Sequence, residues 1–440
     1  MTLDSGFSKN TNTALNFFWA GFIIYSAGFT LAATGNVSYV VCQIIETLGI
    51  ILFFPSAIML IHFRLDNSYL KIVFFLYTAW LFSVIMRGID LDYSKLKVLL
   101  FNAEHGILLY FVPLVLLFPK NLIYLKKVFI VIVVLGVIFL LYDVLFLKNL
   151  LDLSQKNYNT KFTFEYFTKI LSVPSGFILL TYAYHSRRMN LFAFLVIIVT
   201  IGFALIRARR ALIFISFSPV LFAYFLYMYR GKLKVLIIIL SLISGSFLFY
   251  IGLNIYNQNK YGAFALITNR FSVDTRSIVE DYFYQDMNTE NWIIGKGIYG
   301  EYYCPGIDEG TYISSYRPMI ETDYLNIILK GGIIRLGLLL LISIPALILG
   351  IFNSNNLLSK AAGIWIFLWL LNLYPATVNT FSMNHILVWI SIGICFSREI
   401  RTMPESSVKE ILANRRIVQS RVKVLSVPEI INKTHNLVHE

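Results

Sequence analysis

The sequence predicts an all-α integral membrane protein with about twelve transmembrane helices and one large loop on the side of the membrane opposite both termini. Of its 440 residues, 58% are hydrophobic and only 14% are charged, whereas a soluble domain carries about 25% charged residues. The charged residues lie in short groups between apolar runs of roughly 17–25 residues, the length that a helix needs to cross ~30 Å of hydrocarbon. Inside lipid the backbone must satisfy its own hydrogen bonds, so these runs are expected to be helices.

The expected spans follow one another closely along the chain. They lie near residues 14–34, 38–62, 70–86, 98–118, 128–147, 165–184, 191–206, 211–229, 235–256, 324–351, 361–376 and 381–397. Pro375 interrupts the apolar sequence between the last two. The chain is thereby divided into nine spans within 1–256, a large extracytoplasmic loop over 257–323, three spans within 324–397 and a basic tail over 398–440.

The basic residues predict the orientation, because cytoplasmic loops carry an excess of Lys and Arg. Arg187 and Arg188 lie in one such short loop, and the tail from Arg398 is also basic, so both termini are expected in the cytoplasm. The net charge of +13 is interpreted as this bias and not as nucleic-acid binding, since no soluble basic domain is present. The tail stretch "VKEILANRRIVQSRVKVL" predicts an amphipathic helix on the anionic inner leaflet.

Patterns that would hold a metal ion are weak, and no metal or cofactor is expected. Asp90 and Asp92 match the spacing of a nucleotide-sugar metal site, but on the expected outer side they are better interpreted as a solvated loop. His435 and His439 would share a helical face without a third ligand, which favours a solvated tail. The chain contains no phosphate-binding loop, dinucleotide fingerprint or CxxC pair.

Three arginines break the expected charge distribution. Arg207, Arg209 and Arg210 lie at a tight turn between the seventh and eighth spans, on the expected outer side. An arginine at the centre of a membrane helix costs about 2.5–3.5 kcal/mol. The turn is therefore either a helix-end cluster that reaches the lipid headgroups or an anion site, because the planar guanidinium suits phosphate oxygens.

The large loop differs from the rest of the chain in being polar and rich in tyrosine. Its aromatic residues are Tyr282, Tyr284, Trp292, Tyr299, Tyr302, Tyr303, Tyr312 and Tyr316, and Tyr324 follows directly after it. Aromatic rings with a polar edge suit sugars, which are part apolar and part hydroxyl. We expect Tyr299, Tyr302, Tyr303 and Tyr324 to bind glycan, with an interfacial belt on lipid headgroups as the alternative.

Further charged residues join the three arginines on the expected outer side. Arg270 and Arg276 lie in the loop, and Glu321 and Asp323 come just before the tenth span. Arginines can stabilise a departing phosphate, and a carboxylate can accept a proton from an attacking hydroxyl. The set therefore fits a transfer from a lipid pyrophosphate to a sugar hydroxyl. The simpler alternative for the two carboxylates is capping of the helix that follows.

Three stretches resemble the O-antigen polymerase and O-antigen ligase superfamily. They are "LIRARRALIFISF", "DTRSIVEDYFYQDMNTENWIIGKGIYGEYY" and "ETDYLNIILKGGIIRLGLLLLI", and they fit the family in order, in spacing and in the position of the loop. The resemblance covers about residues 200–350. In this family the substrates are undecaprenyl-pyrophosphate-linked glycans at the outer face of the bacterial inner membrane.

The resemblance implies a metal-independent, inverting polymerase, with Arg210 and Arg276 as its functional arginines. Glu321 stands where ligases usually carry a histidine, which favours a polymerase over a ligase that acts on lipid A core. Arg335 replaces a glycine of the family pattern and puts close helix packing at that point in doubt. The implied partners are the lipid-linked oligosaccharide, as donor and acceptor, membrane lipid and a chain-length regulator protein. A lipid-linked oligosaccharide flippase is the alternative from another class, although no internal repeat is visible.

Overall fold

The computed structural model describes residues 9–89, 92–119, 121–151, 163–230, 276–305 and 315–413, together with five isolated residues between 246 and 258. The described chain is mostly helical, which confirms the predicted all-α class and is consistent with a membrane protein. Within it, seven helices are long and apolar enough to cross a membrane. They are α1 (Lys9–Ala32), α2 (Tyr39–Leu60), α3 (Ser68–Met86), α6 (Leu122–Leu145), α10 (Arg187–Ile206), α11 (Arg210–Arg230) and α16 (Asp323–Phe352). The expected ninth span, 235–256, lies almost wholly outside the described residues.

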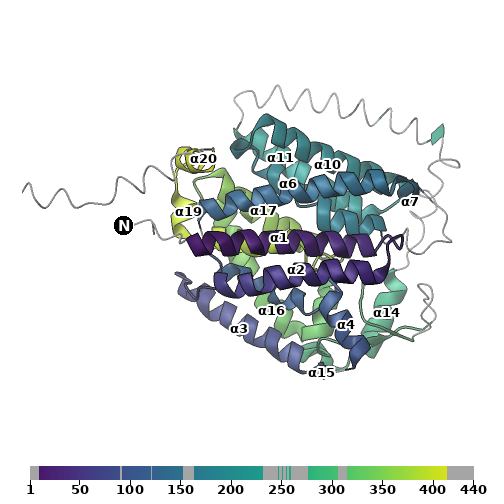
Figure 1. Ribbon diagram of the computed structural model, residues 1–440. Helices are drawn as coiled ribbons and strands as arrows, with labels where there is room; N and C mark the ends of the chain where they lie inside the picture. The colour runs from purple at the N-terminus through teal and green to yellow at the C-terminus, as the bar shows by residue number, and fades with distance from the viewer. Residues whose placement is uncertain are drawn as a thin grey trace, which may run out of the picture.

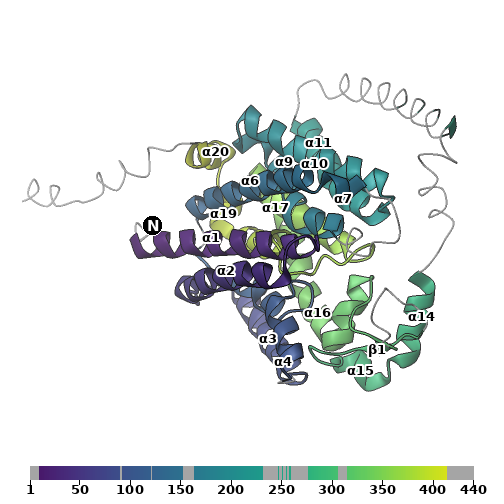
Figure 2. The same cartoon turned by 45° about the vertical axis from the view of Figure 1, so that its right-hand side comes forward.

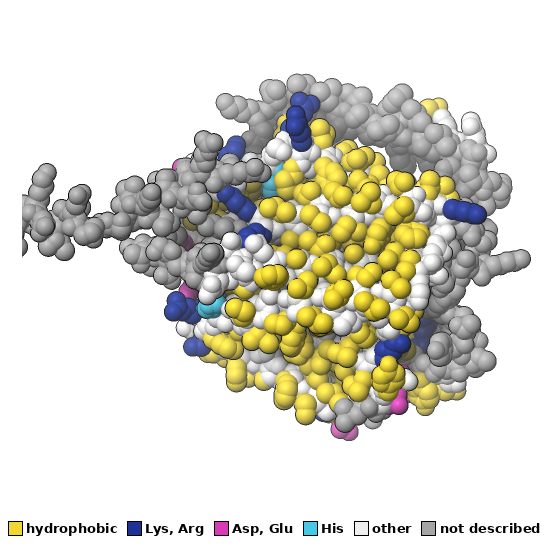
Figure 3. Space-filling model, in the orientation of Figure 1, with side chains coloured by type: hydrophobic (Ala, Val, Ile, Leu, Met, Phe, Trp, Pro, Cys, Tyr) yellow, Lys and Arg dark blue, Asp and Glu magenta, His cyan; other side chains and the backbone are white. Residues whose placement is uncertain are grey.

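The long helices run side by side, so the bundle has two ends (Figure 1). The tail end carries the start of α1 and the short helices α19 (Arg398–Thr402) and α20 (Glu405–Ala413). The loop end carries α7 (Leu147–Leu151) and α14 (Arg276–Asp286). Hydrophobic side chains cover the face between the two ends, and most of the Lys and Arg visible on this face lie toward its edges (Figure 3). This distribution is that of a surface in contact with lipid.

The expected fourth span, 98–118, is not one helix. The chain forms α4 (Tyr93–Phe101), a non-helical segment over 102–107, α5 (Leu108–Phe111) and a 3₁₀ helix, η1 (Val112–Leu117). Asn102 explains the break, because its side-chain oxygen accepts hydrogen bonds from the backbone N–H groups of Glu104 and His105, at 2.7 and 2.9 Å. Such local bonds compete with the helical pattern.

The expected sixth span, 165–184, is also interrupted. After a helical turn over 163–166 come a π-helical segment, η2 (Phe167–Ser172), then α9 (Ser175–Leu180) and η3 (Tyr182–Tyr184). Pro174 lies at the break, where it lacks a donor and clashes with the preceding turn. Residues 167–181 are all buried. Irregular backbone at membrane depth is tolerated where protein surrounds it in this way.

The last two expected helices end and begin further from Pro375 than predicted, because the connection around Pro375 is longer. Helix α17 (Leu357–Asn372) and helix α18 (Met383–Phe396) are joined by the non-helical segment 373–382, of which residues 376–382 are buried. In the tail, α20 buries Val408 and Leu412 and packs against α6 and η3. These two apolar residues therefore contact protein, whereas the sequence placed them on lipid. The tail beyond residue 413 lies outside the described residues.

The described part of the large loop contains α14, α15 (Thr289–Ile294) and a short antiparallel pair, β1 (Tyr302–Tyr303) and β2 (Tyr316–Arg317). These elements stand beside the first turns of α16 (Figure 2). They share a small hydrophobic core of their own, built around Val279, Phe283, Tyr302 and Leu329. The loop is therefore a packed structure over these residues and holds the N-terminus of α16 in place.

Candidate active site

A buried carboxylate organises the loop end. Asp323, the first residue of α16, is fully buried. Its side chain accepts hydrogen bonds from the backbone N–H groups of Val378 and Asn379, at 2.7 and 2.6 Å. Its own N–H donates to the carbonyl of Leu373 at 2.8 Å. Asp323 therefore fixes the 373–382 connection, which is a role different from the expected capping of its own helix.

An accessible ion pair lies next to this carboxylate. The Arg276 Nε is 3.2 Å from the Glu321 carboxylate, and Arg276 also donates to the carbonyl of Pro375 at 2.6 Å. The Arg276 side chain is 37% exposed and that of Glu321 is 56% exposed. One turn further along α14, Glu280 accepts a hydrogen bond from the hydroxyl of Thr322. The start of α14 thus pairs the Arg276 guanidinium with the Glu321 carboxylate at the surface. Glu321 lies two residues before Asp323 in the sequence.

A second charged group is buried where the irregular segments meet. Lys169 of η2 is 6% exposed and lies 2.6 Å from Glu165 and 3.5 Å from Glu104 of segment 102–107. The hydroxyl of Tyr166 donates to Glu104 at 3.1 Å. Segment 102–107 in turn contacts segment 373–382, since the N–H of Phe381 donates to the carbonyl of Ala103 at 2.7 Å. We call Glu104, Glu165, Lys169 and Arg209 the buried charge cluster.

The arginine turn contacts this cluster through Arg209, whose guanidinium lies 3.7 Å from Glu165. Arg207 points to α7 instead and donates to the carbonyls of Asn149 and Leu150, at 3.3 and 2.8 Å. Arg210 is exposed at the start of α11. Between them Ala208 is buried with φ of 52°, a conformation that is uncommon for a residue other than glycine. The turn thus directs Arg207 and Arg209 to different partners, Arg207 to α7 and Arg209 to Glu165.

The Gly-Lys-Gly turn of the second resembling stretch interlocks with the third. The N–H groups of Lys296 and Gly297 donate to the carbonyls of Leu329 and Lys330, at 2.7 and 3.0 Å. These carbonyls are free because α16 is kinked at Gly332, where φ is 69°. A Cβ atom on Gly332 would lie 2.0 Å from the carbonyl oxygen of Ile293. Close packing of α15 on α16 therefore occurs at this point.

Arg335 does not prevent that packing, because its side chain turns away from α15. It is 3% exposed, and its guanidinium carbon lies 4.8 Å from the centre of the Tyr110 ring. It also lies beside the Tyr77 side chain. A buried arginine is tolerated when aromatic rings and hydroxyl groups surround it in this way.

The four tyrosines expected to bind glycan differ in their surroundings. Tyr302 is fully buried in the loop core, and its hydroxyl donates to the carbonyl of Met319 at 3.3 Å. Tyr299 donates to the carbonyl of Lys95 at 2.8 Å, and Tyr324 donates to that of Leu370 at 2.6 Å. Tyr303 is 44% exposed and packs edge-on against Tyr316. The Tyr303 ring is therefore the most accessible of the four.

The structure brings together Arg276, Glu321 and Asp323 and, through the buried charge cluster, joins Arg209 to the same region. It turns Arg207 away and leaves Arg210 at the surface. Arg270, Asp90, His435 and His439 lie outside the described residues, whereas Asp92 caps α4 by accepting bonds from the N–H groups of Ser94 and Lys95. No group of three or more His, Cys, Asp and Glu side chains in the described ranges could hold a metal ion.

Sequence reasoning missed three members of the buried charge cluster, Glu104, Glu165 and Lys169. Their signal was present, because a charged residue inside an apolar run marks a functional or paired position by default. What the sequence could not show is that Glu104, more than sixty positions earlier in the chain, is the partner of Lys169. The sequence predicts a continuous helix over 98–118. That prediction gives no reason to pair Glu104 with a residue of η2.

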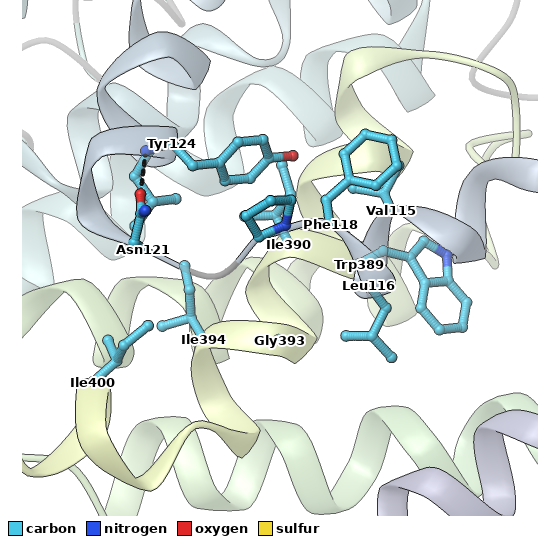
Figure 4. A pocket seen from close by; sticks show the side chains of 12 residues that line it. Val115, Leu116, Phe118, Asn121, Tyr124, Trp389, Ile390, Gly393, Ile394 and Ile400 are labelled. Carbon is cyan, nitrogen blue, oxygen red and sulfur yellow. Dashed lines mark hydrogen bonds between the residues drawn. The ribbon is translucent and has the colours of Figure 1, made fainter. Parts of the chain in front are cut away.

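A separate pocket lies at the tail end (Figure 4). It is lined mostly by apolar side chains, including Phe118, Trp389 and Ile400. The ring of Tyr124 lies along its wall, and Asn121 accepts a hydrogen bond from the Tyr124 N–H (Figure 4). No charged residue lines it. This pocket therefore lacks the groups for acid, base or phosphate chemistry, which are gathered at the loop end.

Comparison of the chain with protein-family models, curated proteins and solved structures found no match in any of the three. The assignment of a function therefore depends on the geometry of the site and on the residues of the three resembling stretches.

Proposed function

We propose that this protein is a polysaccharide polymerase, which joins undecaprenyl-pyrophosphate-linked oligosaccharide repeat units on the outer face of the bacterial inner membrane. The observation that carries the proposal is the accessible Arg276–Glu321 pair, 3.2 Å apart. Two residues after Glu321, the Asp323 carboxylate is held by two backbone hydrogen bonds. In this proposal the chain crosses the membrane about twelve times, the loop end faces the periplasm and both termini are cytoplasmic.

The residues suggest a division of roles. Arg276, with Arg210 at the start of α11, would hold the donor pyrophosphate and stabilise the charge that develops on it. Pyrophosphate carries more negative charge than a carboxylate, so its arrival would draw Arg276 away from Glu321. Glu321 is then free to accept a proton. Asp323 already accepts two backbone hydrogen bonds, which favours it as a positioning residue and Glu321 as the base.

The proposed reaction is one displacement. The hydroxyl oxygen at the non-reducing end of the acceptor attacks the anomeric carbon of the donor, on the face opposite the pyrophosphate. The bond from that carbon to the pyrophosphate oxygen breaks, and its electron pair leaves with the lipid pyrophosphate. The hydroxyl proton passes to Glu321. The configuration at the anomeric carbon is inverted, and the energy comes from breaking the donor's own bond between the sugar and the pyrophosphate.

The test is a reconstituted reaction that contains purified protein and one lipid-pyrophosphate repeat unit, without nucleotide. We expect products longer than one repeat from the wild-type protein. We expect Arg276→Ala and Arg210→Ala to insert normally and to stop elongation, whereas Arg188→Ala, in the exposed first turn of α10, serves as a matched control and elongates. Full-length glycan ladders from both loop-end variants would refute the proposed mechanism.

One observation favours a transporter of the same lipid-linked substrates as the second candidate. Three irregular segments, 102–107, 167–174 and 373–382, meet around charged side chains, as discontinuous helices do in transporters. Movement of a labelled lipid-linked glycan across vesicles, without bond formation, would support this alternative. Transfer of the glycan to added lipid A core would instead indicate a ligase.

A further inference from the structure

One face of α14 continues the candidate site beyond Arg276. Residues four apart on a helix lie above one another, so Arg276, Glu280 and Tyr284 form a single row. The first two members of this row contact the chain just before α16, through Glu321 and Thr322. Tyr284 is the next member, and its side chain is 48% exposed. The row therefore leads from the ion pair to an accessible aromatic ring.

Two further rings accompany Tyr284. Trp292 of α15 stacks on it, with ring centres 6.1 Å apart and planes within 8° of parallel. Tyr374 is 67% exposed and directly precedes Pro375, whose carbonyl accepts the hydrogen bond from Arg276. Burial, and then the neighbouring Glu280, Asp281 and Tyr374, raise the pKa of Tyr284. We call Tyr284, Trp292 and Tyr374 the aromatic platform.

The charges around the platform select against an anionic partner. Glu280 and Asp281 of α14 lie near Tyr284, and Glu290 belongs to α15, the helix that carries Trp292; Asp281 and Glu290 are exposed. Anionic lipid headgroups would be repelled by this set of carboxylates. Neutral polyhydroxyl ligands would not be repelled, because carboxylate oxygens accept hydrogen bonds from hydroxyl groups while the rings cover an apolar sugar face.

We propose that the aromatic platform is a glycan subsite, on which a sugar ring of the lipid-linked oligosaccharide stacks next to the Arg276–Glu321 pair. This inference rests on the proposed function. It names Tyr284 and Tyr374 as specificity-determining residues in addition to the tyrosines expected from the sequence. The arrangement places the sugar beside the Arg276–Glu321 pair, where proximity of the reacting groups contributes most to the rate.

Binding is tested first, without the reaction. The probe is the repeat-unit oligosaccharide released by mild acid from the source cell's own surface polysaccharide, free of lipid. Saturation-transfer NMR with the full-length protein in nanodiscs measures its affinity. We expect Tyr284→Ala and Tyr374→Ala to bind it about three- to tenfold more weakly, since each removes one aromatic contact. Tyr284→Phe keeps the ring and should restore binding.

Tyr227→Ala is the matched control, because Tyr227 is 51% exposed in the last turns of α11, away from the arginine turn at the other end of that helix. Its affinity should equal that of the wild type. Equal affinity in Tyr284→Ala, Tyr374→Ala and wild type would overturn the platform. A change in binding to phosphatidylglycerol vesicles, with oligosaccharide affinity unchanged, would also overturn it and identify the rings as an interfacial belt.

The elongation assay separates this inference from the proposed function. With wild-type elongation established, the platform variants should raise the substrate concentration for half-maximal rate about three- to tenfold and leave the maximal rate within about twofold. Unchanged half-saturation would refute the platform while the polymerase assignment stands. If wild-type protein forms no polymer although the oligosaccharide binds and the platform variants weaken that binding, the polymerase assignment fails and the glycan subsite remains.

Discussion

Removing the Lys169 ammonium is the sharpest test of the buried charge cluster. In this cluster the two negative charges of Glu104 and Glu165 are balanced by the two positive charges of Lys169 and Arg209. The Lys169→Met variant keeps a side chain of similar length and leaves one negative charge in excess. Both carboxylates lose a close cation, since Lys169 lies 2.6 Å from Glu165 and 3.5 Å from Glu104, and Arg209 lies further from Glu165, at 3.7 Å.

The magnitude follows from the burial of Lys169, which is 6% exposed. Removing one partner from a buried ion pair costs about 3–5 kcal/mol, because the remaining charge stays without compensation. That is a large share of the ~5–15 kcal/mol that stabilises a typical folded domain. We therefore expect the unfolding midpoint to fall by at least about 5 °C, from the relation between stability and melting temperature for large domains.

The assay is intrinsic tryptophan fluorescence of the purified protein during heating in detergent. Glu104→Gln combined with Lys169→Met removes one charge of each sign, and this double variant should recover at least half of the lost midpoint. Lys169→Arg, which keeps the charge, should lie between the wild type and Lys169→Met. Lys71→Met serves as the control, since Lys71 is exposed on α3, and should shift the midpoint by less than about 1 °C.

Equal midpoints for Lys169→Met and the wild type would refute the reasoning, because they would show that no energetically important pair exists at Lys169. A double variant that is less stable than Lys169→Met would contradict the charge balance. In that case the hydrogen bond from Tyr166 to Glu104 would matter more than the cluster's net charge.

Three further changes test the loop end. Gly332→Ala would place a Cβ atom 2.0 Å from the Ile293 carbonyl oxygen in a left-handed conformation, so protease sensitivity of α15 should rise sharply. Asp323→Ala removes the acceptor of two charge-assisted backbone bonds, each worth about 1.5–3 kcal/mol, and should lower the thermal midpoint as well as elongation. Glu321→Gln alters an accessible pair worth only ~0–1 kcal/mol, so it should reduce elongation with the midpoint unchanged; a parallel fall in both would contradict its role as base.

Much of the fold could be predicted from the sequence, because hydrophobic length is a local property. The runs around α1, α2, α3, α6, α10, α11 and α16 contain enough apolar residues to cross a membrane whatever their neighbours are. The ends of several helices follow a local rule as well. Asp92 before α4 and Asn121 before α6 cap the helices that follow them, as short polar side chains at that position generally do.

The interrupted spans could not be read in the same way. An apolar run such as 165–184 satisfies the length rule, so it predicts a continuous helix. Whether the backbone can break there depends on having protein on every side to shield the freed polar groups, which is the case for residues 167–181. Pro174 and Asn102 were visible signals, but their effect depends on partners such as Phe381, whose N–H reaches the carbonyl of Ala103.

The candidate site was also predictable from the sequence only in part. By itself the sequence determined which residue types were at hand: arginines at a tight turn, an arginine in the loop and two carboxylates before α16. Only the tertiary structure decided that Arg276 lies 3.2 Å from Glu321, that Asp323 instead anchors residues 378 and 379, and that Arg207 turns to α7. The physical reason is that hydrophobicity acts on each segment separately, whereas an ion pair or a hydrogen bond requires two distant segments to be placed within a few ångströms of each other by the packing of the whole bundle.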